Sequence, residues 1–226
     1  MKIYAIIPSG GLGKRVNSPL PKQFLKSNGK EIIAYTLEIF QNSDLIDGII
    51  VATQKDFFYL LEDIKLKYSF SKLIKIIEGG KERQNSVFNA LKSTPAEKDD
   101  LIVVHDAVRP LLSLNILKDA VETAKKYGSA IVATKAKDTL INGNEFVHSY
   151  VDRKEIYYAQ TPQVFRYDIL FEAMKKAEED KFIGTDESML VHRLGYEVKI
   201  VEGSSLNFKI TNVDDIKLFN HLSEDI

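Results

Sequence analysis

The sequence predicts an α/β fold, a Rossmann-like and mostly parallel sheet with helices on both faces. Short runs of β-branched residues alternate along the chain with stretches of helical period. Glycines and polar residues follow several of the apolar runs, where parallel strands end and ligands bind. The 226 residues suffice for one core, and no repeat or linker divides them, so residues 1–226 are predicted to form a single domain.

The apolar runs predict strands, in chain order, and the stretches between them predict helices. Continuous apolar runs are typical of strands that are buried on both faces. Leu117, Ala120, Val121 and Ala124 show the spacing of one helix face. The predicted strands are 3–7, 48–52, 73–77, 101–104, 130–133 and 197–201. The predicted helices are 31–42, 55–69, 81–92, 113–126, 167–178, 185–193 and 213–223.

Residues 137–159 interrupt this alternation, because they have no helical period. Two short strand-like runs, 139–141 and 146–151, flank the turn Asn142-Gly143-Asn144, which is a hairpin signal. An isolated hairpin has little core of its own and is marginally stable. We therefore expect a protruding β-arm that packs against a second subunit.

The composition excludes several classes of protein. The net charge is -1, so the chain has no general attraction to nucleic acid or to an anionic membrane. It has no Cys, which excludes a disulfide framework and thiolate chemistry. The N-terminus enters a strand at once and no apolar run approaches ~18 residues, so neither a signal peptide nor a membrane span is expected. We expect a cytoplasmic enzyme.

The glycine-rich loop after the first strand is the most informative segment. Gly10, Gly11 and Gly13 let the backbone approach a ligand and point N–H groups at it. Arg15 and Lys22 follow, and cations beside such a loop suit a polyphosphate. The loop therefore predicts a nucleotide-phosphate site at the end of the first strand.

Two commoner phosphate loops do not fit this segment. A P-loop needs Ser or Thr after its Gly-Lys pair, where this chain has Arg15. The dinucleotide fingerprint needs a third glycine, where this chain has Val16. A dinucleotide site also runs straight into a helix, whereas Pro19 and Pro21 resist helix formation here.

Two further strand ends carry polar groups. Gly79-Gly80 precedes a polar helix start, where free N–H groups can bind an anion or a base edge, although a plain turn and cap would have the same sequence. Asp106 follows the fourth predicted strand, and a carboxylate there can hold Mg²⁺. His105 is a possible general base, but a phosphate monoester nucleophile is already largely ionised at pH 7.

The motifs together resemble the 2-C-methyl-D-erythritol 4-phosphate cytidylyltransferase family. The string G-G-x-G-x-R-(x)5-P-K-Q is similar to the signature loop of nucleotidyltransferases that activate sugar or polyol phosphates. His-Asp-Ala-x-Arg-Pro, Val-Asp-Arg, Thr-Pro-Gln and Asn-x-Lys-Ile-Thr follow in the family's order. The resemblance covers nearly the whole chain.

The resemblance implies a role for each matching position. It implies a CTP site, a polyol-phosphate site, and transition-state stabilisation by Arg15 and Lys22. It implies a homodimer in which the β-arm carries Arg153 to the partner's acceptor site. It also implies Mg²⁺ or another divalent cation, held mainly by CTP phosphates, with Asp106 as the protein ligand. The nucleotide-binding positions are Pro8, Ser9, Gly10, Gly11, Gly13, Gly80, Lys81, Ser86 and Ala107; the acceptor-binding positions are Asp106, Arg109, Thr139, Arg153, Thr161, Thr185 and Lys209, with Arg153 and Lys209 also catalytic.

Three alternatives to this hypothesis remain. Ribitol 5-phosphate cytidylyltransferases share most of these motifs, but typically have Pro-Val-Arg where this chain has Val151-Asp152-Arg153. A dinucleotide-dependent oxidoreductase is disfavoured, since Thr53-Gln54 stand where its acidic residue would be. A non-catalytic nucleotide-binding regulator would be expected to lose Arg15, Lys22 or Asp106, and all three are present.

Overall fold

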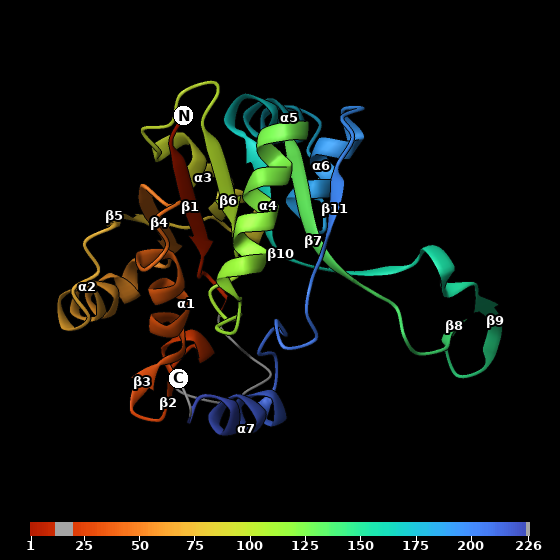
Figure 1. Ribbon diagram of the computed structural model, residues 1–226, viewed down its shortest axis with the longest axis horizontal. Helices are drawn as coiled ribbons and strands as arrows, with labels where there is room; N and C mark the ends of the chain where they lie inside the picture. The colour runs from red at the N-terminus through yellow and green to blue at the C-terminus, as the bar shows by residue number, and fades with distance from the viewer. Residues whose placement is uncertain (12–19, 225–226) are drawn as a thin grey trace.

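A seven-stranded sheet forms the centre of the computed structural model, which describes residues 1–11 and 20–224 (Figure 1). Its strands lie in the order β11-β7-β10-β6-β1-β4-β5. β1 pairs in parallel with β4 and β6, β4 with β5, and β7 with β11, so the predicted mostly parallel sheet is confirmed. The strands are β1 (Ile3–Pro8), β4 (Gly48–Thr53), β5 (Leu73–Glu78), β6 (Leu101–Val104), β7 (Ser129–Lys135), β10 (Tyr157–Arg166) and β11 (Lys199–Glu202).

The strand β10 lies inside the sheet and is not among the predicted elements. It runs antiparallel between β6 and β7. The sequence Gln160-Thr161-Pro162-Gln163 breaks its apolar pattern, since a proline cannot donate to a strand ladder. The structure accommodates it with a shift of register between Ala159 and Gln163 against β7. This bulge brings Thr161 next to the end of β6.

Helices cover both faces of the sheet, as predicted. Leu37 of α1, Leu61 of α2 and Leu117 of α4 belong to the core on one face. Val87 of α3 and Leu190 of α6 belong to the core on the other face, together with residues of α5. An amphipathic helix buries its apolar side in this way. The helices are α1 (Ile32–Gln41), α2 (Phe58–Lys67), α3 (Arg83–Ser93), α4 (Leu114–Tyr127), α5 (Tyr167–Glu179) and α6 (Glu187–Arg193).

The last helix, α7 (Val213–Leu222), lies beyond the carboxyl ends of the central strands (Figure 1). Its Phe219 packs edge-on against Tyr35 of α1, with ring centroids 5.1 Å apart. Val108 and Ile210 join them in a small third core. The C-terminal segment is therefore fixed beside the residues that follow β6. The short elements nearby are the 3₁₀ helices η2 (Lys22–Phe24) and η3 (Lys55–Phe57) and the strands β2 (Lys26–Ser27) and β3 (Lys30–Glu31).

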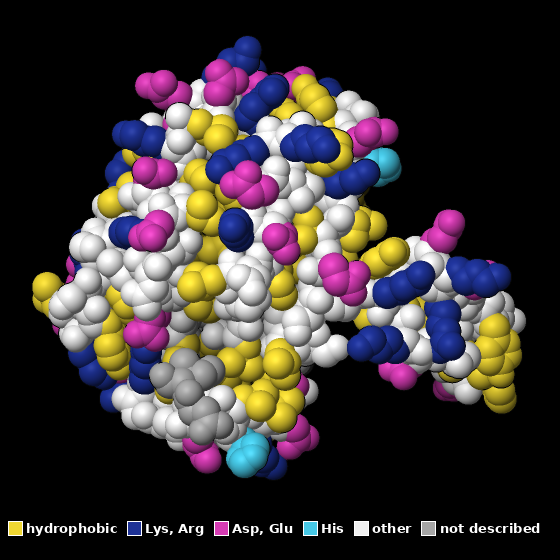
Figure 2. Space-filling view, in the orientation of Figure 1, with side chains coloured by type: hydrophobic (Ala, Val, Ile, Leu, Met, Phe, Trp, Pro, Cys, Tyr) yellow, Lys and Arg dark blue, Asp and Glu magenta, His cyan; other side chains and the backbone are white. Residues whose placement is uncertain are grey.

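The predicted hairpin forms an arm that stands away from the body (Figures 1 and 2). Its strands are β8 (Leu140–Gly143) and β9 (Val147–Val151), and the 3₁₀ helix η4 (Arg153–Glu155) leads back to β10. Two large aromatic side chains on this arm, Phe146 and Tyr150, are 76% and 73% exposed.

Within residues 1–11 and 20–224, no helix has the length and apolar character needed to cross a bilayer.

Candidate functional site

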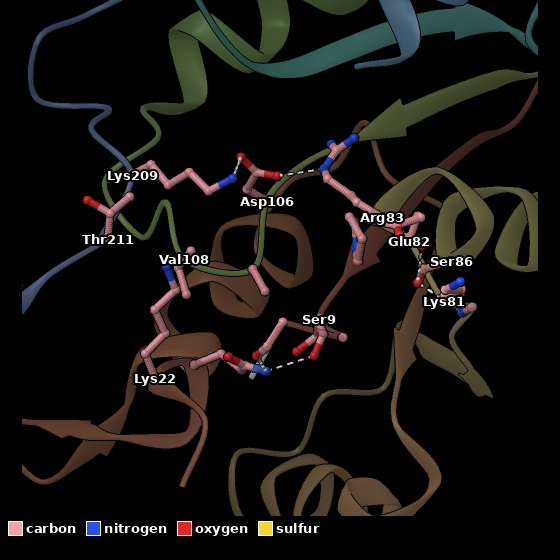
Figure 3. A pocket seen from close by; sticks show the side chains of 16 residues that line it. Ser9, Lys22, Lys81, Glu82, Arg83, Ser86, Asp106, Val108, Lys209 and Thr211 are labelled. Carbon is pink, nitrogen blue, oxygen red and sulfur yellow. Dashed lines mark hydrogen bonds and ion pairs between the residues drawn. The ribbon is translucent and has the colours of Figure 1, made fainter. Parts of the chain in front are cut away.

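A cavity of about 390 Å³ opens where β1 and β6 end (Figure 3). Most of the residues predicted for the site meet there. Those that line it are Pro8, Ser9, Gly10, Gly11, Lys22, Gly80, Lys81, Ser86, Asp106, Ala107 and Lys209. Gln23, Glu82, Arg83, Val108 and Thr211 complete the lining. Of the predicted loop residues, Gly13 and Arg15 lie outside the described residues.

The first residues of the glycine loop are fixed by side chains that bind their carbonyl groups. Gln23 Nε2 donates to the carbonyl oxygen of Ser9 at 2.7 Å and to that of Gly11 at 3.2 Å. Gln54 Nε2 donates to Gly10 O at 3.0 Å. Gln23 is almost fully buried, so its hydrogen bond to Ser9 is shielded from water. The backbone of residues 9–11 is therefore held in place before a ligand binds.

The turn at Gly80 lines the cavity beside the glycine loop, since a Cβ at Gly10 would lie 3.6 Å from Ser86 Oγ. Its N–H donates to Ser86 Oγ at 3.0 Å, and Ser86 Oγ donates to Glu82 O at 3.1 Å. A Cβ at Gly80 would lie 2.3 Å from Asn85 Cβ, so the turn leaves no room for a side chain there. Glu82 and Asn85 form a capping box at the start of α3. Ser86 thus holds the Gly80 turn against the helix.

Asp106 is the centre of a cluster of charges (Figure 3). Arg83 Nε lies 3.1 Å from its Oδ1, and Lys209 Nζ and Arg109 Nε lie 3.0 and 3.3 Å from its Oδ2. Burial alone would raise the pKa of this carboxyl, but Arg83, Lys209 and Arg109 together hold it well below its usual range. The carboxylate therefore stays ionised and orients three cations at the edge of the cavity.

Arg83 has a structural role that sequence analysis did not predict. Its Nη1 contacts both carboxylate oxygens of Glu187, at 2.7 and 2.8 Å, while its Nε contacts Asp106. Burial lowers the pKa of Arg83, but the nearby carboxylates of Glu187 and Asp106 raise it by more, so the pKa lies above its ordinary value. The Glu187 side chain is 1% exposed, and burial raises the pKa of its carboxyl. In the sequence, the only signal for Arg83 is its place in the segment that resembles the family's Gly-Gly-x-x-Arg-x-x-Ser-Val.

His105 is buried behind Asp106 and does not line the cavity. Its Nε2 lies 3.1 Å from Arg109 O, an atom that only accepts, so Nε2 carries the proton. Thr161 Oγ1 then donates to His105 Nδ1 at 3.1 Å and accepts from the Asp106 N–H at 3.1 Å. Burial lowers the pKa of His105 to about 4. A neutral, enclosed imidazole supports a structural role rather than that of a general base.

Lys22 and Arg109 are both held by backbone carbonyl groups. Lys22 Nζ donates to Ile210 O at 2.6 Å. Arg109 Nη1 donates to Asn207 O at 2.7 Å, and burial lowers the pKa of this guanidinium. Each contact joins a residue near the strand ends to the segment that carries Lys209.

Five predicted acceptor residues do not line the cavity within one chain. Arg109 and Thr161 are buried in contact with Asp106. Thr139 and Arg153 lie exposed on the arm, where Arg153 Nη1 donates to Lys137 O. Thr185 lines a separate, smaller cavity of about 220 Å³ that shares Glu82 and Arg83 with the first. The sequence Gly184-Thr185-Asp186-Glu187 makes Thr185 a candidate cap for the following helix, but the cap is Asp186, which accepts from Met189 N at 2.9 Å.

The described residues do not form a metal site of their own. Both oxygens of Asp106 are paired with cations, which would repel a divalent ion at the same carboxylate. Among residues 1–11 and 20–224, no group of three or more His, Asp or Glu side chains is arranged to hold a metal. The earlier expectation of Asp106 as a metal ligand therefore has no support in this geometry.

The fold and the site define a class of protein. A mostly parallel sheet with a glycine loop and a cation-lined cavity at its carboxyl edge is the arrangement expected of a nucleotidyltransferase. The model of the 2-C-methyl-D-erythritol 4-phosphate cytidylyltransferase family matches residues 3–223. The chain belongs to this family.

Relatives and solved structures support the assignment. The chain is 42% identical over 220 residues to the cytidylyltransferase of this name from Syntrophus aciditrophicus, covering 96% of this chain and 94% of the relative. It is 40% identical over 222 residues to the one from Geobacter metallireducens, covering 96% of each. The crystal structure of the Francisella tularensis enzyme matches with a TM-score of 0.84 at 32% identity, covering 98% of this chain and 99% of that one.

Proposed function

We propose that this chain transfers CMP from CTP to 2-C-methyl-D-erythritol 4-phosphate. The products are 4-diphosphocytidyl-2-C-methyl-D-erythritol and pyrophosphate, in the non-mevalonate route to isoprenoid precursors. The observation that carries the proposal is the cavity between the glycine loop and Asp106, lined by Lys22, Arg83 and Lys209, in a chain of this family.

The nucleotide occupies the side of the cavity formed by the two glycine turns. Backbone N–H groups of Gly10, Gly11 and Gly13 bind the triphosphate, and Gly80, Lys81, Ser86 and Ala107 bind the cytidine part. Arg15 and Lys22 stabilise the charge that develops as the acceptor phosphate attacks the α-phosphorus and pyrophosphate leaves. Such chemistry depends on positioning and charge, so it needs no general base from His105.

The acceptor occupies the side formed by Asp106 and Lys209. Lys209 is 37% exposed and binds the acceptor's phosphate, while Asp106 accepts from its hydroxyl groups. Arg109 and Thr161 hold Asp106 in position, at 3.3 Å and 3.1 Å. Thr185 approaches the acceptor from the neighbouring cavity.

A divalent cation enters as part of the nucleotide substrate. Mg²⁺ prefers phosphate oxygens and water as ligands to an enclosed protein site. This preference suits a cavity in which the central carboxylate, Asp106, is already paired with Arg83 and Lys209. Lys22 and Lys209 complete the neutralisation of the phosphates around it.

The arm completes the acceptor site of a second subunit. Its exposed Phe146 and Tyr150 make it a strong candidate for burial in a homodimer. In that dimer Thr139 and Arg153 would reach the partner's cavity, and Arg153 would bind the acceptor phosphate opposite Lys209. The arm explains why these two residues lie far from the site in their own chain.

The decisive experiment measures pyrophosphate release from CTP and Mg²⁺ with two acceptors, 2-C-methyl-D-erythritol 4-phosphate and ribitol 5-phosphate, side by side. We expect turnover with the first and at most a trace with the second. Turnover with ribitol 5-phosphate alone would support the cytidylyl transfer reaction but show that the acceptor is ribitol 5-phosphate. No release with either, from folded protein that binds CTP, would contradict the proposal.

A further inference from the structure

The segment that carries Lys209 has no helix or strand, yet it is anchored on both sides of this residue. It joins β11, which ends at Glu202, to α7, which begins at Val213. After Lys209, Ile210 N donates to Val108 O at 2.9 Å. Before it, Asn207 is completely buried. The position of the Lys209 backbone therefore depends on these two anchors.

Asn207 uses its buried amide to bind the bulge of β10. Its Nδ2 donates to Thr161 O at 2.8 Å and to Gln160 Oε1 at 3.2 Å. Its backbone carbonyl accepts from Arg109 Nη1 at 2.7 Å. Both donor positions of the amide are thus satisfied in a region without water access, where such bonds are strong and their loss is costly.

Gln160 is itself held in one orientation. Its Nε2 donates to Ser204 O at 2.9 Å, so its Oε1 must face Asn207. A Cβ at Gly203 would lie 2.5 Å from this Oε1, which shows how tightly the chain packs over the amide. The two amides form a clamp between β10 and the segment after β11, in which Asn207 Oδ1 has no hydrogen-bond partner.

We propose that Asn207 is a positioning residue for the acceptor's phosphate, because its buried amide fixes the backbone from which Lys209 reaches the cavity. The inference rests on the proposed function for the identity of that acceptor. A lysine side chain loses much rotamer freedom when it binds a phosphate. Anchoring its backbone and pairing its ammonium with Asp106, 3.0 Å away, arranges it before the acceptor arrives.

The kinetic test compares Asn207→Ala with the wild type and combines it with Lys209→Ala. We expect Asn207→Ala to raise the KM for the acceptor on the order of ten-fold, while the KM for CTP changes less than about two-fold. In the Lys209→Ala background the same change should have less than about a two-fold effect. An equal effect in both backgrounds, or an equal rise in the KM for CTP, would overturn the proposal.

Two further variants guard against a general loss of folding. Gln160→Met removes half of the clamp at similar volume and should raise the acceptor KM by a smaller factor. Gln41→Ala is the control, because this amide also makes two hydrogen bonds, to Ser71 Oγ and from Lys72 N, both at 2.9 Å and outside the cavity lining. We expect Gln41→Ala to leave both KM values unchanged.

Amide hydrogen exchange tests the clamp without any turnover. In Asn207→Ala we expect residues 204–210 to exchange at least about ten-fold faster, with the β1 and β6 strands unchanged. Unchanged exchange in 204–210 would overturn the positioning role. If the wild type releases no pyrophosphate while exchange responds as expected, the proposed function fails and the clamp stands.

Discussion

The enclosed His105 makes the stability of the protein depend on pH. Its pKa of about 4 lies below the 6.5 of an ordinary imidazole, because burial disfavours the charged form. The stability that this neutral ring contributes is complete above pH 6.5 and is lost as the pH falls toward 4. Between pH 7 and pH 5 the loss amounts to about 2 kcal/mol.

Urea unfolding at pH 7 and pH 5 measures this loss. In His105→Asn the unfolding free energy should be lower at pH 7 and should fall less on acidification, since no imidazole remains to be protonated. An equal fall in wild type and variant would assign the pH dependence to other groups.

Lys22 should contribute to the chemical step more than to acceptor binding. We expect Lys22→Ala to lower kcat on the order of 100-fold, with a change in the acceptor KM of less than about three-fold. Lys26→Ala is the matched control, because this nearby lysine is 59% exposed and pairs loosely with Glu31. A large rise in the acceptor KM with kcat preserved would refute the role given to Lys22.

The residues that line the cavity were largely predictable, whereas those that hold them were not. Gly10, Gly80 and Asp106 stand in motifs at strand ends, where topology alone brings side chains together, and Lys209 stands in the Asn-x-Lys-Ile-Thr motif. Arg83 and its partners depend on which buried groups meet across the fold. Local sequence patterns do not show which groups contact Arg83, since a buried charge needs an oppositely charged partner but the pattern does not say which residue provides it.

At the scale of elements, Arg83 joins α3 to α6 and to the end of β6. Removing it leaves the buried Glu187 without its partner, so Arg83→Met should cost about 3 kcal/mol of unfolding free energy. The double variant Arg83→Met/Glu187→Leu should recover part of this loss, because no carboxylate is then left unpaired at α6. Urea denaturation of the three proteins measures the difference.

A surface ion pair provides the comparison for this experiment. Lys217 and Asp214 of α7 lie 3.1 Å apart but are 72% and 88% exposed. Lys217→Met should therefore leave the unfolding midpoint nearly unchanged. If Arg83→Met were equally mild, the Arg83–Glu187 pair would have no special part in joining the two helices.

The parallel strands and helices followed from periodicity, but β10 did not. Its neighbours are uninterrupted apolar runs, whereas its own run contains Pro162 and polar Gln160 and Gln163. The two glutamines can be buried because their amides form hydrogen bonds with other parts of the fold. Gln163 Nε2, for example, donates to Asp186 Oδ2 at 3.0 Å. A strand whose polar groups are satisfied by tertiary contacts does not show the pattern of a buried strand.

At the scale of the whole molecule, the arm predicts complementation between two inactive variants. Arg153→Ala and Lys209→Ala would each abolish most turnover alone. In a dimer with crossed arms, a mixed pair has one site with both residues intact, so equal mixing and reassociation should restore about a quarter of wild-type activity. A mixture as inactive as its components would show that Arg153 does not act across subunits.

The place of β10 also determines when the sheet can close during synthesis. β6 and β7 follow one another along the chain, but β10 lies between them and comes 22 residues or more after β7 ends. Until residues 157–166 leave the ribosome, β6 therefore has one unpaired edge, and β7 has two, because its other neighbour β11 is made later still. The arm is made during this same interval. Completion of the sheet is thus a late event in the synthesis of this chain.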